Sequence, residues 1–316
     1  MPLLSPQKVH DRVAWRLGRQ QVSVGGVVDL VVLGGLGVDV RVRVPALPLP
    51  AADSHTVEPI ELRIGNTGAG VALAARALGL RVLVVDTLGA DPAGELVRAA
   101  LTRAGVPAVL AENRDGTRRS VNLVDPGGRR TSLYDPRPWR GGPPFSVPEL
   151  AALVRDARHV HLSIMDWAVP LLPAVRAAIA AGVALSTDLH DWDGENAYHR
   201  PFADVADLVL VSGVRLGDRA ASLAGTLAPR TVLVTRGADG AELFPGDGTV
   251  TPVPPASAPG PVIDSNGAGD AFAAGLIAAR LRGEPLADAA RYAARVAAAA
   301  CAHDGMEYPP GLLPSG

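Results

Sequence analysis

The chain has 316 residues, of which 48 % are hydrophobic and 4 % aromatic, and its formal net charge is −2. This balanced charge offers no electrostatic footprint for nucleic acid or for an anionic membrane surface. Because Lys8 is its only lysine and Cys301 its only cysteine, the chain excludes a lysine-type P-loop, internal disulfides and cysteine-rich metal sites.

The N-terminal residues 1–28 lack the uninterrupted apolar core of a signal peptide, and we interpret them as a loosely attached extension. No apolar run in the chain reaches the roughly 18–20 residues that a membrane helix needs. We therefore expect a cytoplasmic protein, and the single cysteine agrees with a reducing compartment.

The first strand is predicted at 29–35, DLVVLGG, an apolar run with the length of a buried strand. Apolar and polar residues then alternate near 38–62, which is typical of an antiparallel strand with one solvated face. A helix is predicted over about 69–78, ending at Gly79. After a further strand, a second helix is predicted over about 92–104.

Residues 117–134 predict a hairpin that turns at DPGG, 125–128. From residue 149 helices again alternate with strands, and two Ala-rich helices are predicted over about 268–282 and 286–303. Such alternation is typical of a mostly parallel sheet covered by helices on both faces. We therefore expect one α/β domain over residues 29–316.

The two alternating segments, near 38–62 and 108–135, do not fit a sheet that is buried on both faces. We expect them to form a small antiparallel sheet that projects from the domain as a lid.

Residues 264–270 read DSNGAGD and lead directly into a helix of small residues. Helix N-termini carry unpaired N–H groups and a partial positive charge, so Gly267, Ala268 and Gly269 could direct backbone donors at an anion. Asp270 would lie in the first helical turn, where an ionised acid can receive a proton from an attacking hydroxyl. A helix start with acidic capping is the plainer alternative.

The same stretch resembles the C-terminal signature D-[ST]-x-G-A-G-D of the ribokinase-like (PfkB) carbohydrate kinases, and the match is complete. The resemblance implies a three-layer αβα fold, Asp270 as the catalytic base, and Gly267–Gly269 as the anion hole for the transferred γ-phosphate. It also implies that Asp264 organises the loop. In relatives that bind a monovalent cation, such as K⁺, this region contributes to the cation site.

The resemblance extends toward the N-terminus of the chain. Asp39 follows the Gly-rich turn where the family has an acid that binds substrate hydroxyls. The segment 65–79, GNTGAGVALAARALG, is similar to the signature GGxxANxAxxxARLG, which makes Gly65, Asn66 and Gly70 candidate substrate contacts. Asn66 replaces the usual second glycine and Gly70 replaces an asparagine that contacts substrate, so we expect a different pocket floor.

The segment 232–244, VLVTRGADGAELF, resembles the strand-turn-strand beside the nucleotide in this family. The resemblance therefore implies that Thr235, Arg236 and Gly237 lie near the phosphates of ATP, with Asn266 as a further nucleotide contact. For Arg236, a solvated turn arginine is an equal alternative.

One feature of the family is missing: the N-x-x-E motif, whose acid acts on Mg²⁺ through water, is replaced by residues with Ser212 and Arg215 in those places. Either Mg²⁺ is held by other groups, with Asp188 or Asp218 as candidates, or Arg215 partly neutralises the phosphate. Degraded catalysis is the third possibility.

The sequence therefore leads to the hypothesis of an ATP- and Mg²⁺-dependent kinase that phosphorylates a hydroxyl of a sugar or sugar-like small molecule, with Asp39 and Asn66 orienting the acceptor. A nucleoside kinase of the same fold stays open because Trp139, Trp167 and Trp192 could stack a base. The third alternative is a non-catalytic homologue that binds a nucleotide or sugar. By resemblance, we expect a homodimer through the lid.

Overall fold

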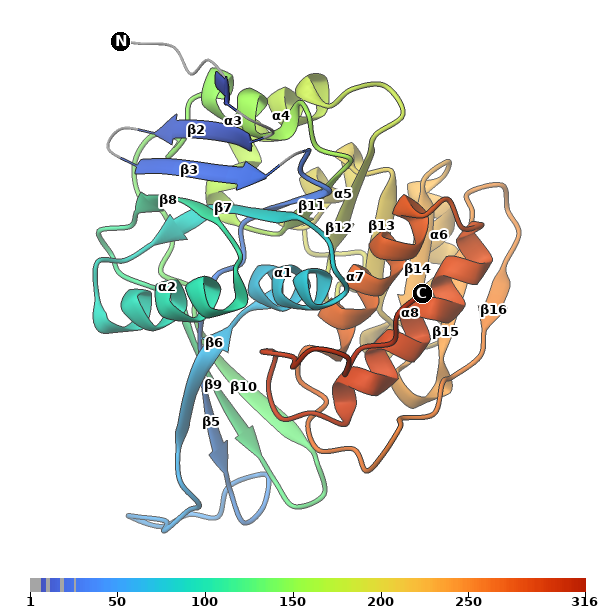
Figure 1. The fold of residues 1–316 in the computed structure, drawn as a ribbon. Helices are drawn as coiled ribbons and strands as arrows, with labels where there is room; N and C mark the ends of the chain where they lie inside the picture. The colour runs from blue at the N-terminus through green and yellow to red at the C-terminus, as the bar shows by residue number, and fades with distance from the viewer. Residues whose placement is uncertain (1–6, 10–11, 18–19, 26) are drawn as a thin grey trace.

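The computed structural model of the chain describes residues 7–9, 12–17, 20–25 and 27–316. Its centre is a nine-stranded sheet (Figure 1). In spatial order the strands are β16 (Thr251–Val253), β15 (Ala241–Phe244), β14 (Thr231–Thr235), β13 (Leu208–Ser212), β12 (Ala184–Asp188), β11 (His159–Ser163), β4 (Leu30–Leu33), β7 (Val82–Leu88) and β8 (Ala108–Glu112). The strands from β14 to β8 run parallel, whereas β15 and β16 are antiparallel.

Helices cover both faces of this sheet. One face packs on α1 (Thr67–Ala77), α2 (Pro92–Ala104), α7 (Ala268–Leu281) and α8 (Leu286–Cys301). The other packs on α3 (Val147–Val154), α4 (Leu172–Ala178), α5 (Arg200–Val205) and α6 (Ala220–Leu227). Within β4, Leu30 and Val32 belong to the first core and Val31 and Leu33 to the second, as the alternation of a strand requires. The predicted three-layer fold is confirmed.

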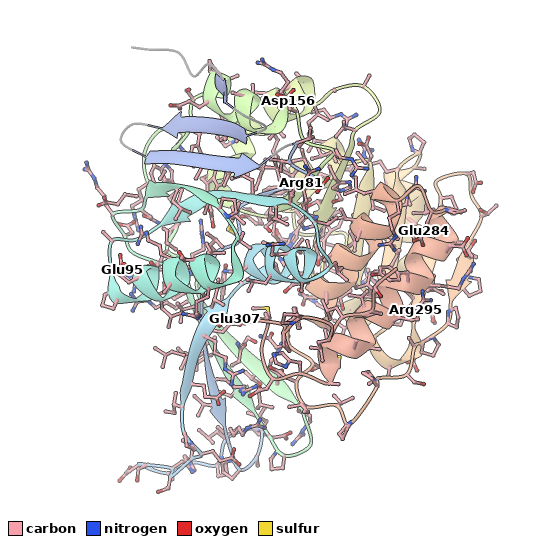
Figure 2. All side chains as sticks on the ribbon, in the orientation of Figure 1. Arg81, Glu95, Asp156, Glu284, Arg295 and Glu307 are labelled. Atoms are coloured by element: carbon pink, nitrogen blue, oxygen red, sulfur yellow. The ribbon has the colours of Figure 1, made fainter. Side chains whose placement is uncertain are left out.

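Short 3-10 turns join several of these elements: η1 (Asp166–Leu171), η2 (Gly213–Arg215), η3 (Gly217–Arg219) and η4 (Gly237–Asp239). The helix predicted over 92–104 has those bounds because Asp91 caps its start and Gly105 ends it in the left-handed conformation. Charged side chains such as Glu95 on α2 and Arg295 on α8 are exposed (Figure 2). None of the described helices is long and apolar enough to cross a membrane.

A four-stranded sheet projects from the domain as the lid (Figure 1). Its strands, in spatial order, are β10 (Arg130–Asp135), β9 (Arg119–Val124), β5 (Gly37–Arg43) and β6 (Glu61–Gly65). The β9–β10 hairpin is antiparallel, as predicted, and so is the β5–β6 pair, but β5 and β9 run parallel to each other.

The range predicted for the second lid segment, 108–135, was too long at its start. Residues 108–112 form β8, which pairs in parallel with β7 at the edge of the main sheet. A strand at the edge of a sheet is partly exposed, and the residues of β8 alternate in burial as those of a lid strand would. The lid itself begins at Arg119 in this part of the chain, and residues 44–60 connect β5 to β6 without a strand.

The described part of the N-terminal extension contains three strands, β1 (Gln7–Val9), β2 (Arg12–Leu17) and β3 (Gln20–Gly25). They form an antiparallel sheet, and β3 lies beside β8 (Figure 1). The boundary at residue 29 and the loose attachment of residues 1–28 stay predictions.

Candidate active site

A cleft of about 610 Å³ lies between the lid and the carboxyl ends of the central strands. From β4 the chain continues to β7 on one side, and from β11 it continues to β12 on the other, so the strand order reverses between the neighbours β4 and β11. Ligands of open α/β sheets bind at such a switch point. The cleft is lined by lid residues Asp39, Ser120, Asn122, Arg130, Ser132 and Tyr134 and by residues of the main domain that include Asn66, Thr67, Met165, Asp166, His190, Tyr198, Asn266, Asp270 and Met306.

Asp270 lies in the first turn of α7 and is 8 % exposed. Burial raises the pKa of its carboxyl well above the usual range, and the negative charges of Asp188 and Asp39 raise this pKa further, while Arg130 lowers it. The side chain lies against Gly70 of α1: a Cβ added to Gly70 would be 2.1 Å from Asp270 Oδ2. A buried acid with a raised pKa at a cleft is a candidate for proton transfer.

The loop before α7 turns sharply at Gly267 into the start of the helix. Gly267 is in the left-handed conformation with φ 80°, and a Cβ there would be 2.8 Å from Met306 Cγ. The amide of Ala268 donates to the carbonyl of Ser265 at 3.3 Å, so Ala268 serves the turn. A Cβ on Gly269 would meet nothing within 4 Å, which leaves open space at the helix start, where amides lack acceptors within the helix.

Asp39 lies across the cleft on lid strand β5. Ser120 Oγ donates to its Oδ1 at 2.5 Å, and Asn266 Nδ2 donates to its Oδ2 at 3.0 Å. A Cβ added to Gly65 would be 2.2 Å from Asp39 Cγ, so Gly65 serves by making room for this carboxylate. Arg130 Nη1 donates to Asn266 Oδ1 at 2.7 Å. The structure thus brings Asn266, predicted as a nucleotide contact, beside Asp39, which was predicted to contact the acceptor.

Asn66 caps helix α1 beside Asp39's strand. Its Oδ1 accepts the amide of Thr67 at 3.0 Å, and its Nδ2 donates to the hydroxyl of Tyr134 at 3.1 Å. Thr67 Oγ1, also at the cleft, is buried without a hydrogen-bond partner among the described residues. Asn66 and Thr67 therefore present polar groups to the cleft. Gly70, predicted as a substrate contact, contacts Asp270 instead.

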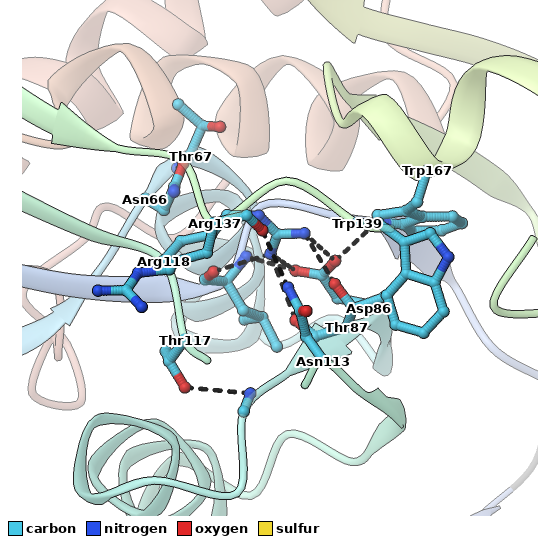
Figure 3. Close-up of polar contacts among 12 residues, drawn as sticks. Asn66, Thr67, Asp86, Thr87, Asn113, Thr117, Arg118, Arg137, Trp139 and Trp167 are labelled. Atoms are coloured by element: carbon cyan, nitrogen blue, oxygen red, sulfur yellow. Dashed lines mark hydrogen bonds and ion pairs between the residues drawn. The ribbon is translucent and has the colours of Figure 1, made fainter. Parts of the chain in front are cut away.

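A buried ion pair anchors the lid to the main sheet (Figure 3). Arg118 Nη1 donates to Asp86 Oδ2 at 2.9 Å, and the two side chains are 3 % and 0 % exposed. The same carboxylate accepts the Leu36 amide at 2.7 Å and Trp167 Nε1 at 2.8 Å. Leu36 precedes β5 and Arg118 precedes β9, so Asp86 fixes the roots of both lid strands.

The residues predicted to lie near ATP follow the main sheet: Thr235 ends β14, and Arg236 and Gly237 begin the turn η4 that follows. Arg236 Nε donates to Glu242 at 2.8 Å, and its Nη1 donates to the carbonyl of Gly217 at 3.0 Å. The guanidinium therefore holds the turn itself, which agrees with the alternative of a turn arginine.

Asp188 ends β12, and its Oδ1 accepts the amide of His190 at 2.8 Å. Its charge reaches Asp270, since it contributes to the raised pKa of that residue. Among the described residues, no group of three or more His, Cys, Asp or Glu side chains is arranged to hold a metal ion.

Arg215, the alternative partner for the phosphate, lies 3.2 Å from Asp193. This ion pair already balances the charge of the guanidinium.

Asp264 does not fit a monovalent cation. Its Oδ2 accepts Arg41 Nη1 at 2.9 Å and its Oδ1 accepts the amide of Asn266 at 2.9 Å. Both carboxylate oxygens are engaged, and the adjoining guanidinium would repel a second cation.

Several cleft residues had no signal in the sequence. Ser120 lies opposite Asp39 in the pairing of β5 with β9, and only the register of these strands brings the two together. Tyr134 and Tyr198 are the described aromatic side chains at the cleft, whereas Trp167 and Trp192 are buried at 2 % and 3 % exposure. Base stacking by these two tryptophans would require them to leave the core.

Comparison with known proteins agrees with this geometry. Residues 202–310 match the pfkB family carbohydrate kinases. The chain is 43 % identical over 277 residues to the acarbose 7(IV)-phosphotransferase of an Actinoplanes species, covering 86 % of this chain and 92 % of the relative. It is 29 % identical to the ATP-dependent ribose-1-phosphate kinase of Halopiger xanaduensis, covering 90 % and 95 % of the two chains.

Among solved structures, a microbiome-derived acarbose kinase superposes with a TM-score of 0.81 at 42 % identity, covering 90 % of this chain and 95 % of the other. Ribokinase of Arabidopsis thaliana, solved with ribose and ATP, has a TM-score of 0.74 at 22 % identity over 92 % and 96 % of the chains, a likeness of fold alone. The chain matches the two relatives at 42–43 % identity, an acarbose phosphotransferase and an acarbose kinase, along nearly their whole length. It is therefore an ATP-dependent kinase of a sugar-like small molecule and belongs to the pfkB family of carbohydrate kinases.

Proposed function

We propose that the acceptor is an oligosaccharide-like compound of the acarbose type and that Asp270 is the base that activates its hydroxyl. The observation that carries the proposal is the position of Asp270, at the start of α7 and across one cleft from Asp39. Two relatives above 40 % identity that are named for acarbose support this acceptor class.

In the proposed reaction, Asp39 and Asn66 accept and donate hydrogen bonds to acceptor hydroxyls, which fixes one of them beside Asp270. Asp270 takes its proton while the hydroxyl oxygen forms a bond to the γ-phosphorus. The bond from that phosphorus to the bridging oxygen breaks, and ADP leaves. The amides of Gly267 and Gly269 would donate hydrogen bonds to the phosphoryl oxygens, whereas the amide of Ala268 serves the turn. This transfer depends mainly on positioning and on stabilising charge.

Residues of the site fit a Mg²⁺ ion that accompanies ATP. Asp188 would hold it, directly or through water, because Mg²⁺ is commonly bound by one or two carboxylates together with phosphates and waters. When bound, the ion would neutralise charge on the phosphates. The engaged carboxylate of Asp264 does not fit K⁺, so we assign no K⁺ to this loop.

The cleft suits an acceptor larger than a single small sugar. Its volume of about 610 Å³ lies in the middle of the range for drug-sized ligands. Tyr134 and Tyr198 offer ring faces on which a sugar ring can pack, and Asp166 and Ser132 offer polar partners in the same cleft.

Two further expectations stay predictions. The lid exposes apolar side chains, Leu62 at 59 % and Leu133 at 56 %, which would suit a homodimer through the lid. The cytoplasmic location suggested by the sequence is also a prediction.

The test is ADP release by the full chain with ATP and Mg²⁺ over a panel of acarbose, ribose and inosine, with phosphorylated products identified by mass spectrometry. We expect acarbose to be turned over best. Asp270→Ala should lower turnover by about 10²–10⁴-fold while ATP still binds. Asp288→Ala, which removes an exposed first-turn acid from α8, is the matched control. Turnover of ribose or inosine alone would overturn the acceptor, and an active Asp270→Ala would overturn the base.

A further inference from the structure

The lid strand β5 contacts the loop before the anion site twice. Asp39 and Arg41 are two residues apart, so their side chains share one face of the strand. Asp39 accepts Asn266 Nδ2 at 3.0 Å, and Arg41 Nη1 donates to Asp264 Oδ2 at 2.9 Å. Neighbouring positions on one strand therefore contact both the acceptor cleft and the loop that starts α7.

Arg41 also reaches a second loop. Its Nη1 lies 2.5 Å from Asp304 Oδ1, in the segment after α8, and its Nη2 pairs with Glu61 on β6. The same two loops are joined by backbone, because the amides of Ile263 and Asp264 donate to the carbonyl of Cys301 at 2.8 and 3.2 Å. Arg41 thus holds together the lid and both loops that flank the anion site.

The guanidinium of Arg41 is held in a fixed position by its carboxylate partners. The Arg41 side chain is only 12 % exposed, and three carboxylates, Asp264, Asp304 and Glu61, contact it. Arg63 pairs with Glu61 and Asp304 from the outside, at 2.9 and 2.7 Å. Removal of Arg41 would leave Asp264 partly buried without its cationic partner, which is costly.

We propose that Arg41 is a positioning residue, a cation built into the lid that holds the 264–269 loop in its phosphate-binding conformation in place of an exchangeable monovalent cation. Asp39 lies on the same strand, so closing the lid on an acceptor also sets the anion site. The inference rests on the proposed function, in that the loop receives the γ-phosphate.

The first test is steady-state kinetics in KCl, NaCl and tetramethylammonium chloride at constant ionic strength. Wild-type kcat should vary less than about twofold among the salts. Arg41→Gln should lower kcat by about 10- to 100-fold, the loss of a hydrogen bond to a charged group. Millimolar guanidinium or K⁺ should restore part of the lost kcat in Arg41→Gln. A merely structural defect would not be rescued by either cation. Arg43→Gln, on the same strand with a 42 % exposed side chain that pairs with Glu58, is the control and should behave as wild type.

The second test needs no acceptor. Hydrogen exchange of peptides over residues 262–270, followed by mass spectrometry, should be faster in Arg41→Gln than in wild type and unchanged in Arg43→Gln. Strong activation of wild type by K⁺ over tetramethylammonium would overturn the inference, as would unchanged exchange in Arg41→Gln. Failure of acarbose as acceptor would contradict the proposed function without altering the exchange result.

Discussion

Gly70 of α1 supports the carboxylate of Asp270 at the start of α7. A Cβ added to Gly70 would lie 2.1 Å from Oδ2 and 2.6 Å from Cγ of Asp270. Real carbon atoms do not approach that closely, so the proposed base keeps its position only because residue 70 has no side chain. A side chain at position 70 would therefore have to shift this carboxylate.

Gly70→Ala should therefore lower kcat by about 100-fold, since a displacement of about 1 Å at a reacting group costs that much. Gly225→Ala is the control, because Gly225 also lies inside a helix but has nothing within 4 Å of an added Cβ. It should keep full activity and gain up to about 1 kcal/mol of stability. Unchanged kcat in Gly70→Ala would show that Asp270 does not need its present position.

The activity should fall with decreasing pH as Asp270 becomes protonated. Because the negative charge of Asp188 contributes to raising the pKa of Asp270, Asp188→Asn should lower that pKa. The acid limb of kcat/KM for ATP, which reports the free enzyme, should then shift to lower pH. Asp156→Asn, at an exposed position after α3, should leave the limb in place. A shift to higher pH in Asp188→Asn would contradict the assignment.

Asp39→Asn should weaken acceptor binding with little effect on ATP. Loss of a hydrogen bond to a charged group costs about 1.5–3 kcal/mol, which corresponds to a 10- to 150-fold fall in kcat/KM for the acceptor. The KM for ATP should stay within about twofold. Asp53→Asn, on the exposed loop between β5 and β6, is the control. An equal loss for both substrates would indicate a general defect of the lid.

The buried pair of Asp86 and Arg118 should dominate the stability of the lid root. Asp86→Ala leaves a buried guanidinium without its partner and should lower the free energy of unfolding by about 3–5 kcal/mol, measured by urea denaturation. Glu95→Ala, which breaks the exposed pair with Arg98, should cost at most about 0.5 kcal/mol. A small effect of Asp86→Ala would mean that water reaches Arg118.

Local patterns in the sequence were sufficient for the layers and for the position of the proposed base. The helix at 92–104 is set by Asp91 and Gly105 at its ends, and the helix predicted over about 268–282 starts at Ala268, within DSNGAGD. Capping and periodicity act between neighbours in the chain, so they are visible in one dimension. β8 was misassigned because its edge position gives it the alternation of a lid strand.

Tertiary structure alone decided which of these parts meet. Asp39 meets Ser120 through the register of two lid strands, and Arg41 meets Asp264 across 223 positions of the chain. Arg118 pairs with Asp86 across 32 positions of the chain, in a buried ion pair at the root of the lid. Such contacts depend on how separate elements pack, so local patterns in the sequence do not predict them. DSNGAGD by itself determined where phosphoryl transfer is proposed to occur, and packing determined what holds that loop in place.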